Sequence, residues 1–297
     1  MNETILMENR TYWTHRAPSY SEVNREELAT HQHAVWKQVL TEQISACFPG
    51  RKPDRIHILE IGTGPGFFAI LLAEAGYRVT AIDLTPSMLD EARSNAGKLC
   101  DCINFREMNA EKLSFVDACF DVILSRNVTW NLSEPEKAYA EWVRVLKSGG
   151  LLLTFDANWY AYLFDDEARA AYERDRKNSF EEGLADYNVG DSFDRMEQLA
   201  RLLPMTRVSR PAWDIETLMN LGLSVKADTR IWERVWSYQE KVNFASTPMF
   251  LVCGEKRNSD GLYINRYKNA ELLEFAGFQP VIVFHNKQPL ESMKAET

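Results

Sequence analysis

Residues 58–69, ILEIGTGPGFFA, place three glycines at alternating positions between an aliphatic run and an apolar segment. A strand that ends in a glycine-rich turn and opens a helix brings backbone N–H groups and the positive end of the helix to one point. Glycines at such a turn allow a ligand to approach the backbone closely. This unit therefore favours an α/β fold with a ligand at the turn.

The segments that follow alternate between strand and helix patterns. We expect apolar strands at 55–62, 77–84, 102–109, 120–127 and 151–158. Continuous apolar strands are typical of a parallel sheet with helices on both faces. Ser133 to Glu136 resembles a capping box that opens a helix ending at Gly149 and Gly150. A further helix and strand are expected within 214–231, and another strand at 246–256.

The organisation of the rest of the chain follows from where this alternation stops. Residues 159–212 lack strand periodicity, and we interpret them as an insertion that forms a lid, because long departures from a compact scaffold usually carry binding or gating. The expected units are a helical cap at 1–50, a cofactor-binding core at 51–158, the lid at 159–212, the last part of the core at 213–257 and an extension at 258–297. Residues 270–284 weakly repeat the helix–glycine–strand pattern of 215–231.

The composition favours a small-molecule partner. The formal net charge of -9 gives no basic field that would attract nucleic acid. Five scattered cysteines are typical of reduced thiols, and the Cys100–Cys102 pair lacks the partners of a metal site. No apolar run reaches the length of about 20 residues that crosses a bilayer, and the amino terminus does not resemble a secretion signal, so we expect a cytoplasmic protein.

The spacing of the glycines restricts the class of ligand that the turn can bind. Gly62, Gly64 and Gly66 give G-x-G-x-G, with Phe67 where the dinucleotide fingerprint has its third glycine, and no lysine completes a phosphate-binding loop. Asp83 ends the next strand. A carboxylate there lies beside the glycine turn and can accept the two hydroxyls of a ribose.

Five motifs together resemble the class I S-adenosylmethionine-dependent methyltransferases, in particular the ubiquinone/menaquinone C-methyltransferases. They are EIGTGPG at 60–66, AIDLTPSML at 81–89, MNAEKLSF at 108–115, FDVILSRNVTWNL at 120–132 and RVLKSGGLLLTFD at 144–156. The resemblance implies a Rossmann-like three-layer sandwich with a mostly parallel seven-stranded sheet. It also implies direct in-line transfer of a methyl group from S-adenosylmethionine to a small molecule, with S-adenosylhomocysteine as product and no metal.

The resemblance also implies which residues contact the cofactor. These are Glu60, Gly62, Thr63, Gly64, Gly66, Asp83, Leu84, Met88, Asn109, Ala110, Arg126, Asn127 and Tyr20. Glu60 is expected near the methionine amino group, or else as an anchor of the loop. Asn109 stands where relatives commonly have Asp, and it adds a donor to the acceptor oxygen. Arg126 and Asn127 are expected on the methionine side.

The sequence says less about the residues that bind the methyl acceptor. Tyr20, His15 and Asp156 are candidates for a catalytic role, and the aromatic rings of Tyr12, Trp13 and Tyr20 could cover the sulfonium by cation–π attraction or could pack a terminal helix. Two other functions stay open: a nicotinamide-dependent oxidoreductase, and a non-catalytic S-adenosylmethionine-binding regulator. The expected assembly is a monomer or a homodimer.

Overall fold

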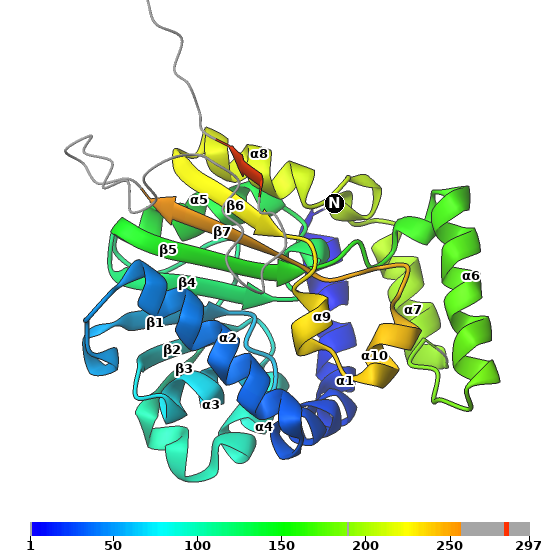
Figure 1. Ribbon diagram of the computed structural model, residues 1–297, viewed down its shortest axis with the longest axis horizontal. Coiled ribbons are helices and arrows are strands. Elements are labelled where there is room, and N and C mark those ends of the chain that lie inside the picture. The colour runs from blue at the N-terminus through cyan, green and yellow to red at the C-terminus, as the bar shows by residue number, and fades with distance from the viewer. Residues whose placement is uncertain (1, 189, 257–281, 285–297) are drawn as a thin grey trace, which may run out of the picture.

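The structure, a computed structural model, describes residues 2–188, 190–256 and 282–284. One sheet runs through the described part of the chain (Figure 1). Its strands are β1 (His57–Ile61), β2 (Arg78–Asp83), β3 (Ile103–Glu107), β4 (Phe120–Arg126), β5 (Leu146–Asp156), β6 (Leu223–Asp228), β7 (Phe250–Lys256) and β8 (Ile282–Phe284).

The strand order is β3-β2-β1-β4-β5-β7-β6-β8. The first five neighbours pair in parallel, which confirms the parallel sheet expected from the sequence. β7 is antiparallel to both β5 and β6. The chain reverses its direction of progress across the sheet between β1 and β4, and ligands of open α/β sheets bind at the carboxyl ends of strands at such a point.

Side chains alternate between the two faces of each strand, and both faces are covered. Ile58 of β1 joins a cluster with Trp36 and Phe68, whereas its neighbour Leu59 joins a second cluster with Tyr139 and Trp142. All six side chains are almost completely buried. Burial on both faces explains why the strands are continuous apolar runs in the sequence.

The helices complete the outer layers and one end of the molecule. They are α1 (Asn2–Ala29), α2 (His31–Cys47), α3 (Phe67–Glu74), α4 (Pro86–Ala96), α5 (Pro135–Val145), α6 (Asp166–Glu181), α7 (Asp191–Ala200), α8 (Ala212–Asn220), α9 (Trp232–Val235) and α10 (Tyr238–Asn243). Helices α2 and α3 cover one face of the sheet, and α5 and α8 cover the other. The parallel strands β4 and β5 point toward the side of the molecule where α1, α9 and α10 lie (Figure 1).

The structure corrects three details of the sequence interpretation. Among the described residues the sheet has eight strands rather than seven, because β8 pairs with β6. Ser133 does not cap α5: the helix starts at Pro135 with Glu134 at its N-cap position, and no side chain forms a capping bond there. The helix also ends at Val145, and β5 begins directly at Leu146, ahead of Gly149.

The segment at 159–212 is helical, with α6, α7 and two short 3-10 helices at Ala161–Leu163 and Pro204–Arg207. Of residues 270–284, where the sequence weakly repeats a helix–glycine–strand pattern, the structure describes 282–284 as β8, and 270–281 lie outside the described residues. Within the part of the chain that the structure describes, no helix combines the length and the apolar character that a membrane span needs.

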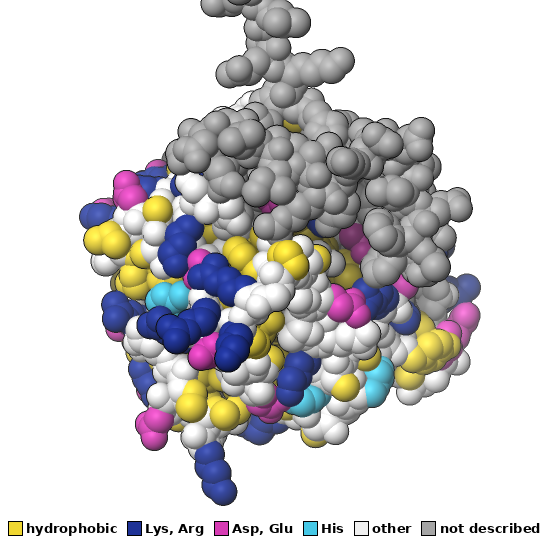
Figure 2. Space-filling view, turned by 60° about the vertical axis from the view of Figure 1, so that its left-hand side comes forward, with side chains coloured by type: hydrophobic (Ala, Val, Ile, Leu, Met, Phe, Trp, Pro, Cys, Tyr) yellow, Lys and Arg dark blue, Asp and Glu magenta, His cyan; other side chains and the backbone are white. Residues whose placement is uncertain are grey.

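The surface away from the strand ends is mixed in character. Figure 2 is turned toward the left-hand side of Figure 1, and Lys and Arg side chains there are interspersed with Asp, Glu, His and apolar side chains. Beneath the surface, the buried carboxylate of Asp121 forms ion pairs with Arg51 at 3.0 Å and with Lys147 at 3.0 Å.

Candidate functional site

The glycine turn joins β1 to α3 with a backbone that other residues rarely adopt. Gly62, Gly64 and Gly66 have φ angles of 65°, 51° and 92°. A Cβ atom on Gly62 would overlap the side chain of Val128, and one on Gly66 would lie 3.0 Å from the Cβ of Ala92 in α4. Glycine is thus needed at 62 for the approach of the loop after β4, and at 66 for helix packing.

Asp83 at the end of β2 holds this turn in place. Its Oδ2 accepts the backbone N–H of Gly64 at 2.9 Å, and its Oδ1 accepts the backbone N–H of Thr85 at 2.9 Å. Burial raises the pKa of Asp83, and these backbone N–H groups oppose the shift. Each carboxylate oxygen has two lone pairs, so both oxygens can accept one further hydrogen bond.

A cavity of about 120 Å³, here called the turn cavity, lies where the carboxyl ends of β1, β2, β3 and β4 meet. Ten of the residues expected to contact the cofactor line it: Tyr20, Gly62, Gly64, Asp83, Leu84, Met88, Asn109, Ala110, Arg126 and Asn127. Helix α1 adds Leu6, Asn9, Arg10 and Trp13 to the lining. Segments far apart in the sequence thus converge on one site.

Three of the expected contacts do not line this cavity: Glu60, Thr63 and Gly66. Glu60 is 4% exposed and accepts a hydrogen bond from Thr63 Oγ1 at 2.7 Å. Burial raises the pKa of Glu60 to about 8, although the Thr63 hydroxyl opposes the shift. The structure therefore favours the alternative in which Glu60 anchors the loop, with Thr63 as its partner.

Asn109 forms a local turn after β3. Its Oδ1 accepts the backbone N–H of Glu111 at 2.8 Å. The carboxylate of Glu111 in turn accepts the backbone N–H groups of Ser133 at 2.7 Å and Glu134 at 2.9 Å. These bonds tie the loop after β3 to the loop after β4. They also explain why Ser133 is not a helix cap, since its hydroxyl bonds to Glu111 instead.

A second cavity of about 1070 Å³, here called the aromatic cavity, adjoins the first. Its aromatic lining consists of Tyr12, Trp13, Tyr20, Trp130, Trp159, Tyr160, Tyr187, Phe193, Trp236, Tyr238 and Phe244. Four residues line both cavities: Trp13, Tyr20, Arg126 and Asn127. We call these four the shared wall. Residues from α1, from the segment 159–212 and from α10 thus form a chamber beside the turn cavity.

The shared wall contains a buried ion pair that the sequence does not reveal. Arg126 Nη1 donates to Glu27 Oε2 at 3.2 Å, and Arg126 Nη2 donates to Glu27 Oε1. The guanidinium also lies 4.9 Å from the ring centre of Trp36 and 5.2 Å from that of Phe67. Glu27 is one of many glutamates in the amino-terminal segment, and only the packing of α1 across the end of β4 singles it out.

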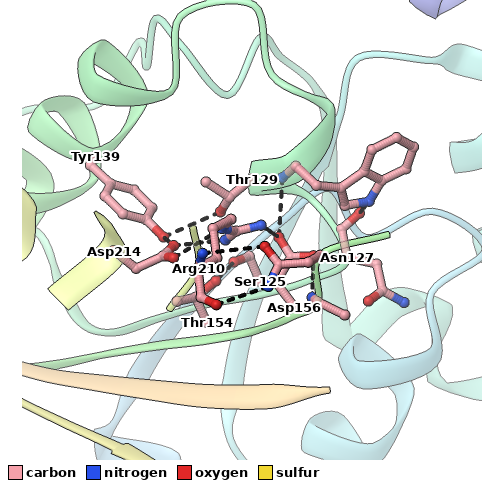
Figure 3. A network of polar contacts seen from close by, with 11 residues as sticks. Ser125, Asn127, Thr129, Tyr139, Thr154, Asp156, Arg210 and Asp214 are labelled. Carbon is pink, nitrogen blue, oxygen red and sulfur yellow. Dashed lines mark hydrogen bonds and ion pairs between the residues drawn. The ribbon is translucent and has the colours of Figure 1, made fainter. Parts of the chain in front are cut away.

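Asp156 does not have the environment of a catalytic base, contrary to its candidacy. It is completely buried, and its Oδ2 accepts Arg210 Nη1 at 2.7 Å and the backbone N–H of Trp130 at 3.1 Å. Arg210 also donates to Asp214, which accepts the hydroxyl of Tyr139 at 2.5 Å (Figure 3). Asp156 lines neither cavity. Asp156 belongs instead to this buried network of polar side chains.

The other two catalytic candidates differ in position. His15 is exposed on α1 and lines neither cavity, so the structure gives it no contact with the site. Tyr20 belongs to the shared wall, and its ring lies 5.5 Å from that of Trp13, edge to face. Burial raises the pKa of Tyr20, while Arg126 opposes the shift. Its hydroxyl is therefore protonated at neutral pH and can donate a hydrogen bond.

Comparison with known proteins agrees with this geometry. Residues 59–154 match the family model described as a methyltransferase domain. The ubiquinone/menaquinone biosynthesis C-methyltransferase of Brucella anthropi is 33% identical over 147 residues, which cover 48% of this chain and 54% of that protein. The demethylmenaquinone methyltransferase of Deinococcus radiodurans is 33% identical over 142 residues, covering 47% and 56%. The chain thus spans about half the length of these curated relatives.

A solved structure shows a similar fold over most of the chain. One chain of the Haloferax volcanii complex between the Trm112 methyltransferase activator and a methyltransferase has a TM-score of 0.52 and 18% identity, and it covers 82% of this chain and 97% of its own length. The strand order and the glycine turn agree with the family match. Residues 59–154 of this chain, which include the glycine turn, are thus similar to a methyltransferase domain.

Proposed function

We propose that this protein transfers the methyl group of S-adenosylmethionine to a small-molecule acceptor in the aromatic cavity. The observation that carries the proposal is the pair of adjoining cavities with one shared wall. One cavity has the glycine backbone and the Asp83 carboxylate. The other has an aromatic lining and a volume large enough for a ligand. Direct transfer between two bound molecules needs such a junction.

The turn cavity fits the chemistry of the cofactor. Asp83 would accept the ribose hydroxyls, and the glycines at 62 and 64 would leave room for the methionine and ribose parts. Leu84 and Met88 offer apolar contacts for adenine. Because Oδ1 of Asn109 already accepts the N–H of Glu111, its amide nitrogen is left for the adenine edge. Asn127 Oδ1 is buried without a hydrogen-bond partner, and it supplies an acceptor at the shared wall.

Helix α1 would close the site over the cofactor. Five of its side chains line the turn cavity, whose volume of about 120 Å³ is below the range of roughly 300–1,000 Å³ that is usual for ligand sites. Binding of the cofactor would therefore move the first half of α1 outward, and the helix would then shield the reacting atoms from water. Residues 159–212 would act as the lid of the aromatic cavity.

The reaction demands mainly positioning. The sulfonium group supplies a good leaving group when the cofactor is bound, so the protein has to orient the acceptor and exclude water. The eleven aromatic side chains of the aromatic cavity suit an acceptor with an apolar or aromatic body. The two curated relatives described above are named as a ubiquinone/menaquinone biosynthesis C-methyltransferase and a demethylmenaquinone methyltransferase, and a quinone is compatible with an acceptor of this kind.

The test is the release of S-adenosylhomocysteine in the presence of a library of small aromatic and apolar metabolites. We expect at least one acceptor to support release that depends on the enzyme, and we expect mass spectrometry to find that acceptor heavier by one methyl group. If the protein binds the cofactor and no acceptor supports release, the catalytic proposal fails and the role of a cofactor-binding regulator takes its place.

A further inference from the structure

The ion pair between Glu27 and Arg126 places a neutralised cation between the two cavities. The two side chains are only 6% and 15% exposed, and they meet in a two-pronged contact from α1 to the end of β4. Arg126 lines both cavities, whereas Glu27 lines the aromatic cavity. Aromatic rings cover the guanidinium, so its charge is poorly screened by water.

Such a cation matters because the methyl donor itself carries one. S-adenosylmethionine has a positive sulfonium, whereas S-adenosylhomocysteine has a neutral thioether; apart from that charge and the methyl group, the two molecules are the same. Transfer from one cavity to the other requires the methyl group to face the shared wall. An uncompensated guanidinium there would repel the donor and leave the product unaffected.

We propose that Glu27 is a specificity-determining residue that neutralises Arg126 and thereby removes a repulsion that would disfavour the cationic methyl donor relative to its neutral product. The inference rests on the proposed function. It assigns to α1 an electrostatic role beyond covering the site, because the helix carries the carboxylate that cancels the charge at the end of β4.

Neighbouring carboxylates do not replace Glu27 in this role. Glu240 of α10 is held elsewhere, since its Oε2 accepts Gln32 at 2.7 Å and the backbone N–H of Ser237 at 2.7 Å. Glu60 is largely protonated at neutral pH because burial raises its pKa to about 8. Asp83 accepts the backbone N–H groups of Gly64 and Thr85. Of these carboxylates, Glu27 is the one that contacts the guanidinium.

The test is calorimetric titration of the Glu27→Gln variant with S-adenosylmethionine and with S-adenosylhomocysteine. We expect the ratio of the two affinities to shift against S-adenosylmethionine by at least about tenfold, with the affinity for S-adenosylhomocysteine changing much less. Glu22→Gln is the matched control, since Glu22 is exposed on the same helix and lines neither cavity, and its ratio should equal that of the wild type.

A double variant separates charge from structure. Glu27→Gln with Arg126→Gln removes both charges, and the inference predicts that it restores the affinity ratio of the wild type, even if both affinities are lower. If Glu27→Gln weakens both ligands equally, or if the double variant keeps the altered ratio, the inference is overturned. If the wild-type protein binds neither ligand, the proposed function itself fails, which is a distinguishable result.

Discussion

Asp83 holds the glycine turn and is the residue that we propose to bind the ribose of the cofactor. Its two oxygens bind the backbone at Gly64 and at Thr85, so the carboxylate orients both the turn after β1 and the start of α4. The same carboxylate lines the turn cavity. One side chain therefore fixes the shape of the site and, in the proposed function, would supply its ribose acceptors.

The Asp83→Ala variant should lose at least about tenfold in affinity for S-adenosylhomocysteine, because two charge-assisted acceptors and the support of the turn are removed together. Isothermal titration calorimetry measures the change. Asp90→Ala is the control, since Asp90 is exposed on α4 and pairs only with Arg93 among the ion pairs found in the described residues. Unchanged affinity in Asp83→Ala would contradict the ribose assignment.

The raised pKa of Glu60 predicts that the stability of the protein depends on pH. Its pKa is about 8 in the folded protein, because of burial, against an ordinary value of 4.5. A carboxyl group with a raised pKa in the folded state makes the protein less stable as the pH rises from about 4.5 through about 8. Asp83 strengthens the shift and Arg126 opposes it.

In the Glu60→Gln variant, which mimics the protonated form, this loss should be absent. Urea unfolding at pH 5 and at pH 8 measures it: the wild type should lose more free energy of unfolding over this interval than the variant does, by an amount of a few kcal/mol. Equal losses in the two proteins would show that Glu60 keeps an ordinary pKa.

Sequence reasoning at the residue scale brought residues to one cavity where a motif fixes both the residue type and its place at a strand end. Gly62, Gly64, Asp83, Asn109 and Arg126 all line the turn cavity. It placed Asp156 incorrectly, because the end of β5 is shielded by Arg210, which follows 54 positions later in the chain. It missed Glu27 for the same reason: the partner of an ion pair between distant segments has no local signature.

At the scale of elements, hydrogen bonds and ion pairs join the two ends of the segment between β5 and α8. Asn158 Nδ2 donates to the backbone oxygen of Arg210 at 2.8 Å, and Asn158 Oδ1 accepts the backbone N–H of Arg210 at 3.2 Å. The guanidinium of Arg210 is completely buried between Asp156 and Asp214 (Figure 3). Burial opposes the charge, but the two carboxylates raise the pKa of Arg210 well above its ordinary value.

Replacing Arg210 with Met should lower the free energy of unfolding by about 3–5 kcal/mol, because it leaves two buried carboxylates without their cation. Chemical denaturation measures the loss. Arg230→Met provides the comparison: its pair with Glu233 is 45% and 38% exposed, and its removal should lower the free energy of unfolding far less than the removal of Arg210 does. Similar losses in the two variants would contradict the stabilising role of the buried ion pairs of Arg210.

The helical nature of residues 2–47 and the five parallel strands could be predicted, since apolar periodicity and glycine positions determine them locally. The start of β5 at Leu146 could not, because Lys147, Gly149 and Gly150 resemble a turn, and only pairing between Phe120 and Leu146 extends the strand. Pairing partners depend on the whole sheet rather than on the segment.

At the scale of the whole molecule, the fold brings the carboxyl ends of four parallel strands together with α1 to form the turn cavity, and places the aromatic cavity beside it. The sequence identified the first cavity, because its residues lie in compact motifs. It could only indicate the general location of the second, because Tyr12, Trp159, Phe193 and Trp236 come from separate helices and loops whose packing has no motif.

The central claim is that the glycine turn and Asp83 hold S-adenosylmethionine, and calorimetric titration of the full chain tests it most directly. S-adenosylmethionine and S-adenosylhomocysteine should each bind with one-to-one stoichiometry, and NAD should produce no binding signal under the same conditions. Saturable binding of NAD, with no heat from either S-adenosyl compound, would contradict the account.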